Sequence, residues 1–172
     1  MAIDFETANP AADSACALCV IRVDREQITQ RMTRLIRPPT SWFTFTYVHN
    51  LTWDHVANEP EFREVWPAMA PLLEGAAFVA AHNAPFDREV LAACCERTGH
   101  PMPTHDFLDT VKLARMAWNL RPTKLPDVCR HLSIPLNHHD ASSDAEACAR
   151  IVLAVIAEGR RAGKGNATES LF

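Results

Sequence analysis

Hydrophobic residues at the start of the chain form short runs that are typical of β-strands. AIDFET begins at residue 2, SACALCVIRV at residue 14 and QITQRMTRLIRP at residue 27. Polar residues 24–27 separate the second run from the third, and Pro38 and Pro39 end the third. Because apolar and β-branched runs bounded by turn residues favour extended structure, this part of the sequence predicts three consecutive strands.

The rest of the chain alternates between helical spacing and short apolar runs. Apolar residues recur every three or four positions from Phe62 to Leu73, and Gly75 follows them, which predicts a helix. AAFVAAH, residues 76–82, has the length of a strand, and NAPFDREVLAACCERTG has the Pro near its start and the terminal Gly of a helix. The segment HDFLDTVKLARMAW, from residue 105, predicts a brief strand and then a helix capped by Asp109.

Further short helices are predicted after Thr52 and in LPDVCRHL, and the last helix is predicted from about Ser142 to Glu158. Three strands followed by strands alternating with helices indicate an α/β fold, in which helices pack on one mixed sheet. We expect a single domain at residues 1–158. The polar, glycine-containing residues 159–172 are expected to form a flexible tail.

Composition narrows the class of protein. With 172 residues, 48% of them hydrophobic, the chain suits one globular domain. It has no apolar run long enough to span a membrane and no signal peptide at its start, so we expect a cytoplasmic protein with six reduced cysteines. Cys16 and Cys19 lie on a predicted strand, where positions three apart face opposite ways, so they are not expected to bind zinc together. The net charge of −4 does not exclude a nucleic acid partner.

Four carboxylates stand at the ends of predicted elements. Asp4 and Glu6 are two apart on the first strand, so their side chains share one face, and Phe5 points the other way. Asp87 and Asp144 each lie in the first turn of a helix. A strand end in solvent would explain the first pair, and favourable interaction with a helix dipole would explain the other two. A buried pair of like charges, in contrast, needs a cation.

Taken together, the carboxylates predict two-metal phosphoryl chemistry. Hard oxygen ligands of this kind hold two Mg²⁺ or Mn²⁺ ions about 3.5–4 Å apart. Such a reaction also needs a base for the attacking water, and imidazole titrates near neutral pH. His138 and His139, in the loop before Asp144, are the candidates. His139 is the better placed of the two, and His138 is expected to be a surface or supporting residue.

DFET, HNAPFD and HDASSD resemble, in order and spacing, the three motifs of the DEDDh 3′–5′ exonucleases, the relatives of the proofreading subunit of bacterial DNA polymerase III. The resemblance extends from Asp4 to about Ile156. It implies a ribonuclease H-like fold whose five-stranded mixed sheet has its first three strands antiparallel. It also implies metal-dependent removal of nucleoside 5′-monophosphates from a 3′ end. The implied metal ligands are Asp4, Glu6, Asp87 and Asp144, with His139 as the catalytic histidine.

The resemblance also suggests where a terminal nucleotide binds. Thr7 and Ala8 follow the first motif, and His49, Asn50 and Leu51 correspond to a segment that relatives place against the terminal base. Asn50 departs from the glycine usual there, although Asn tolerates a positive φ. Only three residues precede Asp4, where relatives usually carry more. Stacking rings are expected from SWFTFTY and Trp53, which could instead fill the core. Candidate phosphate contacts are Arg88, Lys112, Arg115, Arg121 and Lys124.

The expected partners are nucleic acids with a 3′ end, DNA or RNA, together with replication or repair proteins. A homodimer is also expected, since dimers are common in the family, and no membrane is expected. One alternative is a catalytically silent module of nuclease fold that binds nucleic acid ends or replication proteins. The presence of all four carboxylates and the histidine argues against it. A metal phosphatase acting on small esters is a further alternative, for which a closed pocket without stacking rings is expected.

Overall fold

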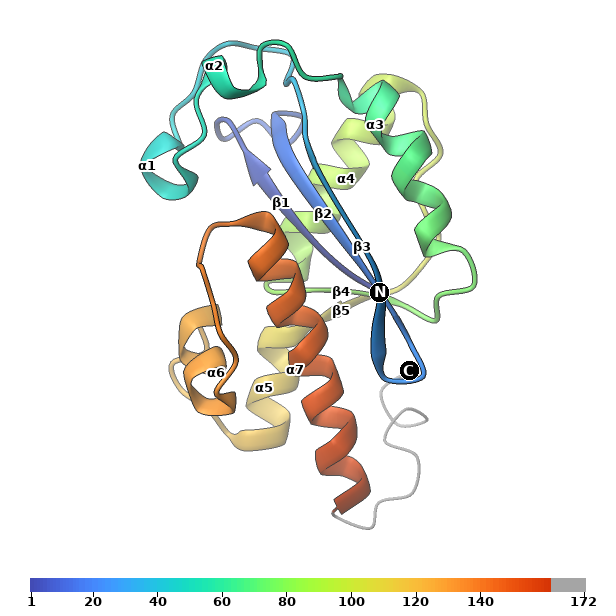
Figure 1. The fold of residues 1–172 in the computed structure, drawn as a ribbon, viewed down its shortest axis with the longest axis vertical. Helices are drawn as coiled ribbons and strands as arrows, with labels where there is room; N and C mark the ends of the chain where they lie inside the picture. The colour runs from blue at the N-terminus through green and yellow to red at the C-terminus, as the bar shows by residue number, and fades with distance from the viewer. Residues whose placement is uncertain (162–172) are drawn as a thin grey trace.

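The computed structural model describes residues 1–161, and a mixed five-stranded sheet forms its centre. The strands lie in the order β3-β2-β1-β4-β5 (Figure 1). β1 and β3 are antiparallel to β2, and β4 is parallel to both β1 and β5. This confirms the predicted ribonuclease H-like sheet with its first three strands antiparallel. The bounds are β1 (Ala2–Thr7), β2 (Ala15–Asp24), β3 (Gln27–Leu35), β4 (Val79–Ala81) and β5 (Phe107–Asp109).

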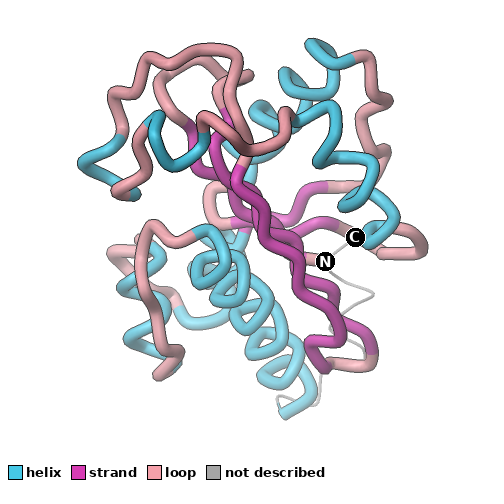
Figure 2. The backbone as a smooth tube through the Cα atoms, turned by 45° about the horizontal axis from the view of Figure 1, so that its top comes forward, coloured by secondary structure: helices cyan, strands magenta, loops and turns pink. Residues whose placement is uncertain are grey.

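Helices cover both faces of this sheet (Figure 2). On one face α3 and α4 contribute Met69 and Leu91 to a hydrophobic cluster with Phe5 of β1. On the other face α5 and α7 form a second cluster with Ala2 and Ala80. In chain order the helices are α1 (Thr46–His49), α2 (Trp53–Val56), α3 (Phe62–Met69), the 3₁₀ helix η1 (Ala70–Leu73), α4 (Ala84–Thr98), α5 (Thr110–Trp118), α6 (Leu125–Leu132) and α7 (Ala141–Arg161).

Successive side chains of β1 point alternately toward the two helix layers that cover the sheet. Ile3 and Phe5 are buried in the cluster formed with α3 and α4. Ala2 belongs to the cluster formed with α7, so Asp4 and Glu6, two and four positions on, face the α7 side. The pairing of β1 with β2 shifts register between Glu6 and Thr7. The strand therefore delivers both carboxylates toward the start of α7.

Several predicted boundaries change in the structure. The predicted helix from 62 to 73 ends as an α-helix at Met69 and continues as η1, because Pro71 has no N–H to donate and its ring crowds the preceding turn. Of the apolar run 76–82, only Val79–Ala81 pairs in the sheet. The helix α1 was not predicted. α7 continues to Arg161, so the first three residues of the expected tail are helical, and residues 162–172 lie outside the described residues.

The six cysteines are free thiols and all are buried. Cys16 packs with Ala8 and Val56, while Cys19 packs in the α7 cluster. The two side chains therefore lie in different clusters, as the strand spacing predicts. Between residues 1 and 161, no helix combines the length and the hydropathy needed to cross a membrane.

Candidate active site

Three of the four predicted carboxylates meet where the end of β1 faces the first turn of α7. Oxygen atoms of Asp4, Glu6 and Asp144 all lie within 4.8 Å of one another. Glu6 and Asp144 are only 8% and 4% exposed. Small residues bring the helix this close to the sheet, because Ala141 and Ala145 pack against β1 and β2 without long side chains. Residues far apart in the sequence thus form one acidic cluster.

Asp87, the fourth carboxylate, lies beneath this cluster in the first turn of α4. Its side chain is 2% exposed, and Oδ1 accepts a hydrogen bond of 3.1 Å from the backbone N–H of Phe5. The bond fixes the first turn of α4 to the strand that carries Asp4 and Glu6. The charge of Asp87 is close enough to raise the pKa of Asp4. The charge of Asp87 therefore acts on the other carboxylates of the cluster, and its Oδ1 is already hydrogen-bonded to Phe5.

Burial and mutual repulsion hold protons on this cluster. Burial, followed by the charges of Asp87, Asp144 and Glu6, raises the pKa of Asp4 well above its usual range. Burial, followed by the charge of Asp144, raises the pKa of Glu6 to about 8. Burial also raises the pKa of Asp87 to about 8, against the hydrogen bond from Phe5. Positive charge placed among these oxygens would relieve both the repulsion and the lost hydration.

One atom of the cluster indicates where such a charge would bind. Oδ1 of Asp144 is buried and has no hydrogen-bond partner among the described residues. Leaving a buried carboxylate oxygen unpaired costs free energy. A hard divalent cation is a partner that would satisfy such an oxygen well. The donor set is entirely oxygen, which suits Mg²⁺ or Mn²⁺. The residues present therefore fit the predicted metal site.

The two histidines occupy the loop that enters α7. The ring of His138 lies with Nδ1 2.9 Å from Oδ2 of Asp144, and the backbone N–H of His139 donates to the same oxygen at 3.0 Å. The two rings are stacked, with centroids 3.7 Å apart. His139 adopts a positive φ of 69°, which turns the chain sharply before the helix. Both imidazoles face the acidic cluster, and the choice of His139 as the catalytic base stays a prediction.

A hollow of about 320 Å³ opens over the cluster. Thr7 and His49, both predicted to bind substrate, line it. Nδ1 of His49 accepts from the N–H of Leu51 at 3.0 Å, so Nε2 carries the hydrogen and donates to the carbonyl of Thr7 at 3.0 Å. Burial lowers the pKa of His49 and keeps its ring neutral. The ring thus fastens the α1 segment to the end of β1.

The structure does not bring the other three predicted substrate residues to the wall of this hollow. Ala8 is fully buried, and its N–H already donates to the carbonyl of Ser14. Asn50 ends α1 in the left-handed conformation, with a φ of 62°, so it supplies the turn that glycine usually makes. Leu51 packs in the core beside Cys16 and Val56. These residues shape the segment without facing the acidic cluster.

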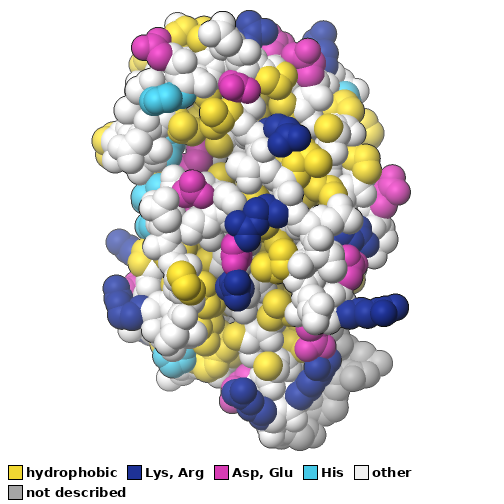
Figure 3. Space-filling model, in the orientation of Figure 1, with side chains coloured by type: hydrophobic (Ala, Val, Ile, Leu, Met, Phe, Trp, Pro, Cys, Tyr) yellow, Lys and Arg dark blue, Asp and Glu magenta, His cyan; other side chains and the backbone are white. Residues whose placement is uncertain are grey.

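The walls of the hollow include aromatic rings from two sides. Phe45 and Tyr47 contribute from the α1 segment, and Phe86 from the first turn of α4. Tyr47 is 81% exposed, whereas Phe43 and Trp53 pack in the core with Val56. The aromatic stretch therefore divides between rings that line the hollow and rings that fill the core. In the space-filling view of Figure 3, histidine and acidic side chains lie together at the left edge of the molecule, between the segments that carry α1 and α6.

His82, Phe86 and Leu125 line the hollow but were not among the predicted site residues. Nε2 of His82 donates to the carbonyl of Thr123 at 3.0 Å, and Nδ1 lies 2.8 Å from the hydroxyl of Thr110. Burial lowers the pKa of His82. A polar residue directly after an apolar strand was the signal that could have marked His82. For Leu125 the sequence holds no such signal.

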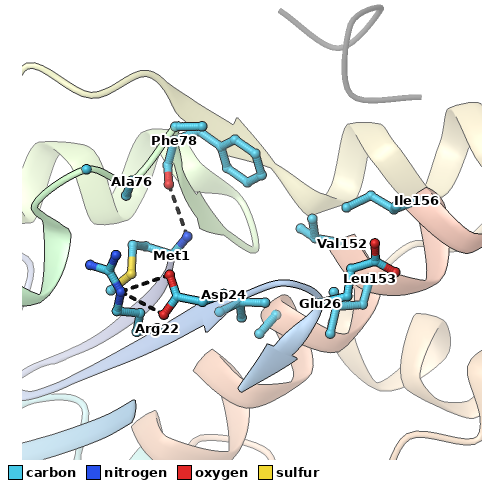
Figure 4. A pocket seen from close by; sticks show the side chains of 13 residues that line it. Met1, Arg22, Asp24, Glu26, Ala76, Phe78, Val152, Leu153 and Ile156 are labelled. Atoms are coloured by element: carbon cyan, nitrogen blue, oxygen red, sulfur yellow. Dashed lines mark hydrogen bonds and ion pairs between the residues drawn. The ribbon is translucent and has the colours of Figure 1, made fainter. Parts of the chain in front are cut away.

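A second hollow, of about 200 Å³, opens near the start of β1 (Figure 4). Its walls are mainly apolar, and the N-terminal ammonium of Met1 donates to the carbonyl of Phe78 at 3.2 Å. Arg22 donates to Asp24, and Glu26 pairs with Arg160. Because each of its charged groups already has a hydrogen-bond or ion-pair partner, this hollow offers no chemistry comparable to that of the acidic cluster.

Comparison with known proteins identifies what the chain is similar to. The RNase_T family model, described as an exonuclease, matches residues 1–152. The chain is 30% identical over 165 residues to the 3′-5′ exonuclease DinG of Bacillus subtilis, covering 92% of this chain and 18% of DinG. It is 26% identical over 165 residues to a PolC-type DNA polymerase III of Thermotoga maritima, covering 94% of this chain and 12% of that protein. The chain thus spans less than a fifth of either relative.

Two solved structures share the fold. Exonuclease X, in a complex with 5′ overhanging duplex DNA, superposes with a TM-score of 0.70 at 22% identity, covering 94% of this chain and 92% of that one. The nuclease domain of 3′hExo, a DEDDh family member bound to rAMP, superposes with a TM-score of 0.78 at 16% identity, covering 92% and 91%. At these identities the superpositions establish the common architecture.

Proposed function

Because the chain belongs to the RNase_T exonuclease family, we propose that it removes nucleotides from the 3′ end of a nucleic acid strand as a DEDDh-type enzyme. The products would be nucleoside 5′-monophosphates. The observation that carries this proposal is the buried, unpartnered Oδ1 of Asp144 beside the carboxylates of Asp4 and Glu6. A purely structural buried carboxylate would have both oxygens hydrogen-bonded, as Oδ2 of Asp144 is to the N–H of His139.

Asp4, Glu6, Asp87 and Asp144 are the residues that we assign to two divalent cations, Mg²⁺ or Mn²⁺. When bound, such cations activate water and neutralise charge on the phosphate. The shared face of β1 and the packing of α7 hold the carboxylates in place before substrate arrives. Asp87 additionally keeps β1 and α4 in register through its bond to Phe5.

His139 is the group that we assign to proton transfer from the attacking water. Burial and the neighbouring ring of His138 lower its pKa, while Asp144 opposes them, so the ring is neutral and able to accept a proton near pH 7. Its backbone N–H is bonded to Asp144, which fixes the loop relative to the carboxylates. His138, bonded to Asp144 through Nδ1, would steady that ligand.

The aromatic rim supports nucleic acid as the substrate rather than a small phosphate ester. Phe45, Tyr47 and Phe86 line an open hollow, and exposed rings such as those of Tyr47 and Phe86 can stack on unpaired bases. We assign Thr7 and His49 to the wall that meets the terminal nucleotide, and Ala8, Asn50 and Leu51 to the segment behind it.

Partners and location are also proposals. We propose that the protein works beside replication or repair proteins in the cytoplasm. The similarity to part of a PolC-type DNA polymerase III supports the replication context. For a homodimer the support is that β3 is a long edge strand of the sheet, and edge strands can pair with a second copy.

The test is degradation of matched DNA and RNA oligomers labelled at the 5′ end. We expect a ladder of products shortened from the 3′ end in Mg²⁺ or Mn²⁺, with nucleoside 5′-monophosphates released, and no cleavage in EDTA. Binding of the oligomers without any cleavage in either metal would instead identify a silent module. Cleavage in EDTA would exclude the metal assignment.

A further inference from the structure

A third hollow, of about 460 Å³, lies beside the hollow over the acidic cluster, which we call the catalytic hollow. The first turn of α4 separates the two. Ala84 and Pro85 line this third hollow, while Phe86, the next residue, lines the catalytic one. Asp109, on the wall of the third hollow, is close enough to Asp87 for its charge to raise the pKa of Asp87. A nucleic acid strand that leaves the catalytic hollow over Phe86 would enter this third hollow.

Two cationic side chains converge on the third hollow from different helices. Arg88 belongs to the exposed face of α4, which also presents Pro85 and Glu89 at helical spacing. Lys112 comes from the first turn of α5. Both side chains are exposed, and neither has an ion pair or hydrogen bond among residues 1–161.

The lack of an acidic partner separates these cations from others of the described chain. Arg31, Arg37, Arg97, Arg130, Arg150 and Arg160 all form ion pairs with carboxylates. Arg88 and Lys112 remain available although two carboxylates, Glu89 and Asp109, line the same hollow. Asp109 is engaged, because its Oδ1 accepts from the N–H groups of Asn83 and Val111. Among the described residues, Glu89 is therefore the one carboxylate of this wall without a hydrogen bond or an ion pair.

The floor of the hollow is apolar. Met102 and Phe107 line it and pack against the core on the α4 side of the sheet. An apolar floor with two free cations at the rim matches the chemistry of a nucleotide, whose sugar and base are largely apolar and whose phosphate is anionic. Phosphates take their binding energy from such cations, and the release of counterions makes that binding depend on salt.

We propose that this hollow is a second phosphate-binding subsite, in which Arg88 and Lys112 hold a backbone phosphate of the nucleic acid away from the scissile bond. The inference rests on the proposed exonuclease function and specifies how the substrate is held. The phosphate belongs either to the cleaved strand, several nucleotides from its 3′ end, or to a complementary strand. Occupation of the subsite increases affinity for oligomers and does not alter the chemical step.

The first test measures binding of a labelled 12-nucleotide single strand, and of a duplex with a recessed 3′ end, in EDTA. Arg88→Gln and Lys112→Gln should each weaken binding, and each should reduce the slope of log affinity against log salt by roughly 0.7. Arg63→Gln, which removes one exposed and unpaired charge from α3, is the matched control and should not weaken binding. Glu89→Gln should strengthen binding, a result that a folding defect cannot imitate.

The second test locates the phosphate. A series of oligomers, each with one uncharged methylphosphonate linkage, is bound to the wild type and to the Arg88→Gln Lys112→Gln variant. The linkage whose neutralisation weakens binding to the wild type, but not to the double variant, is the one held by this subsite. Its position in the cleaved or the complementary strand decides between the two sources. If no linkage in either strand shows that difference, the proposal is wrong.

Failure of this inference can be told apart from failure of the proposed function. The 4-nitrophenyl ester of thymidine 5′-monophosphate has no second phosphodiester, so its hydrolysis in Mn²⁺ reports the catalytic cluster alone. We expect Arg88→Gln and Lys112→Gln to leave that rate within about twofold of the wild type, while KM for the 12-nucleotide strand rises several-fold. Normal hydrolysis of ester and oligomer with unchanged oligomer binding would overturn the subsite alone. No hydrolysis of either by the wild type would overturn the exonuclease function.

Discussion

Nδ1 of His138 lies 2.9 Å from Oδ2 of Asp144, the carboxylate whose other oxygen is buried without a partner. The N–H of His139 reaches the same Oδ2. Two groups of one loop therefore hold Oδ2, while Oδ1 stays unpaired in a carboxylate that comes within 4.8 Å of those of Asp4 and Glu6. We therefore propose different roles for the two adjacent imidazoles, and the difference can be measured.

Replacing His139 with Ala should reduce kcat by roughly 10²–10⁴-fold, because the reaction loses the base that accepts a proton from water. Replacing His138 with Ala should reduce kcat less than tenfold while raising the Mg²⁺ concentration needed for half-maximal rate, because Asp144 loses one of its two tethers. Rates measured over a Mg²⁺ titration distinguish the two. The assignment of the base is wrong if His138→Ala causes the larger loss of kcat.

Asp4→Ala and Asp144→Ala should abolish hydrolysis, with losses of about 10³-fold or more, because each removes a ligand that no other residue replaces. Isothermal titration with Mn²⁺ should show weaker binding in both variants. Thermal melting in EDTA is the control for folding. Asp4→Ala should not melt below the wild type, because it loses a repelling carboxylate, whereas Asp144→Ala also loses its hydrogen bonds with His138 and His139 and should still unfold cooperatively. Near-full activity of either variant in Mg²⁺ would refute the proposed metal site.

Asp87→Asn should stabilise the metal-free protein at high pH. The folded chain holds the pKa of Glu6 and Asp87 at about 8, whereas unfolded carboxyls titrate at about 4. Between these values the folded state binds more protons, so wild-type stability falls as pH rises from about 4 to 8. The Asn variant keeps the acceptor for the N–H of Phe5 and loses the charge.

The measurement for Asp87→Asn is urea unfolding in EDTA at pH 5 and pH 8. We expect the variant to exceed the wild type by roughly 1–3 kcal/mol at pH 8 and by less at pH 5. Mg²⁺ should stabilise the wild type more than the variant at pH 8. A gain in stability of the same size at both pH values would mean that ionisation of Asp87 is not its cause.

His49→Ala should destabilise the fold by about 1–3 kcal/mol, because the carbonyl of Thr7 and the N–H of Leu51 both lose their buried partner. Burial lowers the pKa of His49 in the folded state, so its contribution to stability is present above the unfolded pKa of about 6.5 and is lost as pH falls. Urea unfolding at pH 5 and pH 7.5 checks both parts. The gap between wild type and variant should be wider at pH 7.5.

Tyr47→Ala should raise KM for single-stranded oligomers by roughly 5- to 150-fold, the equivalent of one lost base stack of about 1–3 kcal/mol. Tyr47→Phe should retain most of the affinity, because the ring does the stacking. Trp42→Ala is a matched control, since Trp42 is 61% exposed but does not line the catalytic hollow. Equal effects of the Tyr47 and Trp42 substitutions on KM would indicate that Tyr47 does not bind the substrate.

Much of this fold was predictable because short stretches of the sequence specify its strands and helices. The alternation in AIDFET placed Asp4 and Glu6 on one face of β1, and Gly99 ended α4 with a φ of 72°. Asp109 caps α5 as predicted, accepting from Val111. α1 was missed since Phe45 stands at its N-cap position and offers no capping side chain, whereas the equally short α2 begins after Thr52.

The sequence by itself determined the residue types and spacings of the acidic cluster, and the three motifs in register identified the family. Only the tertiary structure decided which groups meet. Asp87 turned out to be bonded to Phe5, Ala8 to be buried, and His82 to face the catalytic hollow. The physical reason is that side-chain periodicity is a property of one element, whereas a site is made where the ends of several elements converge. That convergence depends on how α7 and α4 pack on the sheet, which no single stretch of sequence encodes.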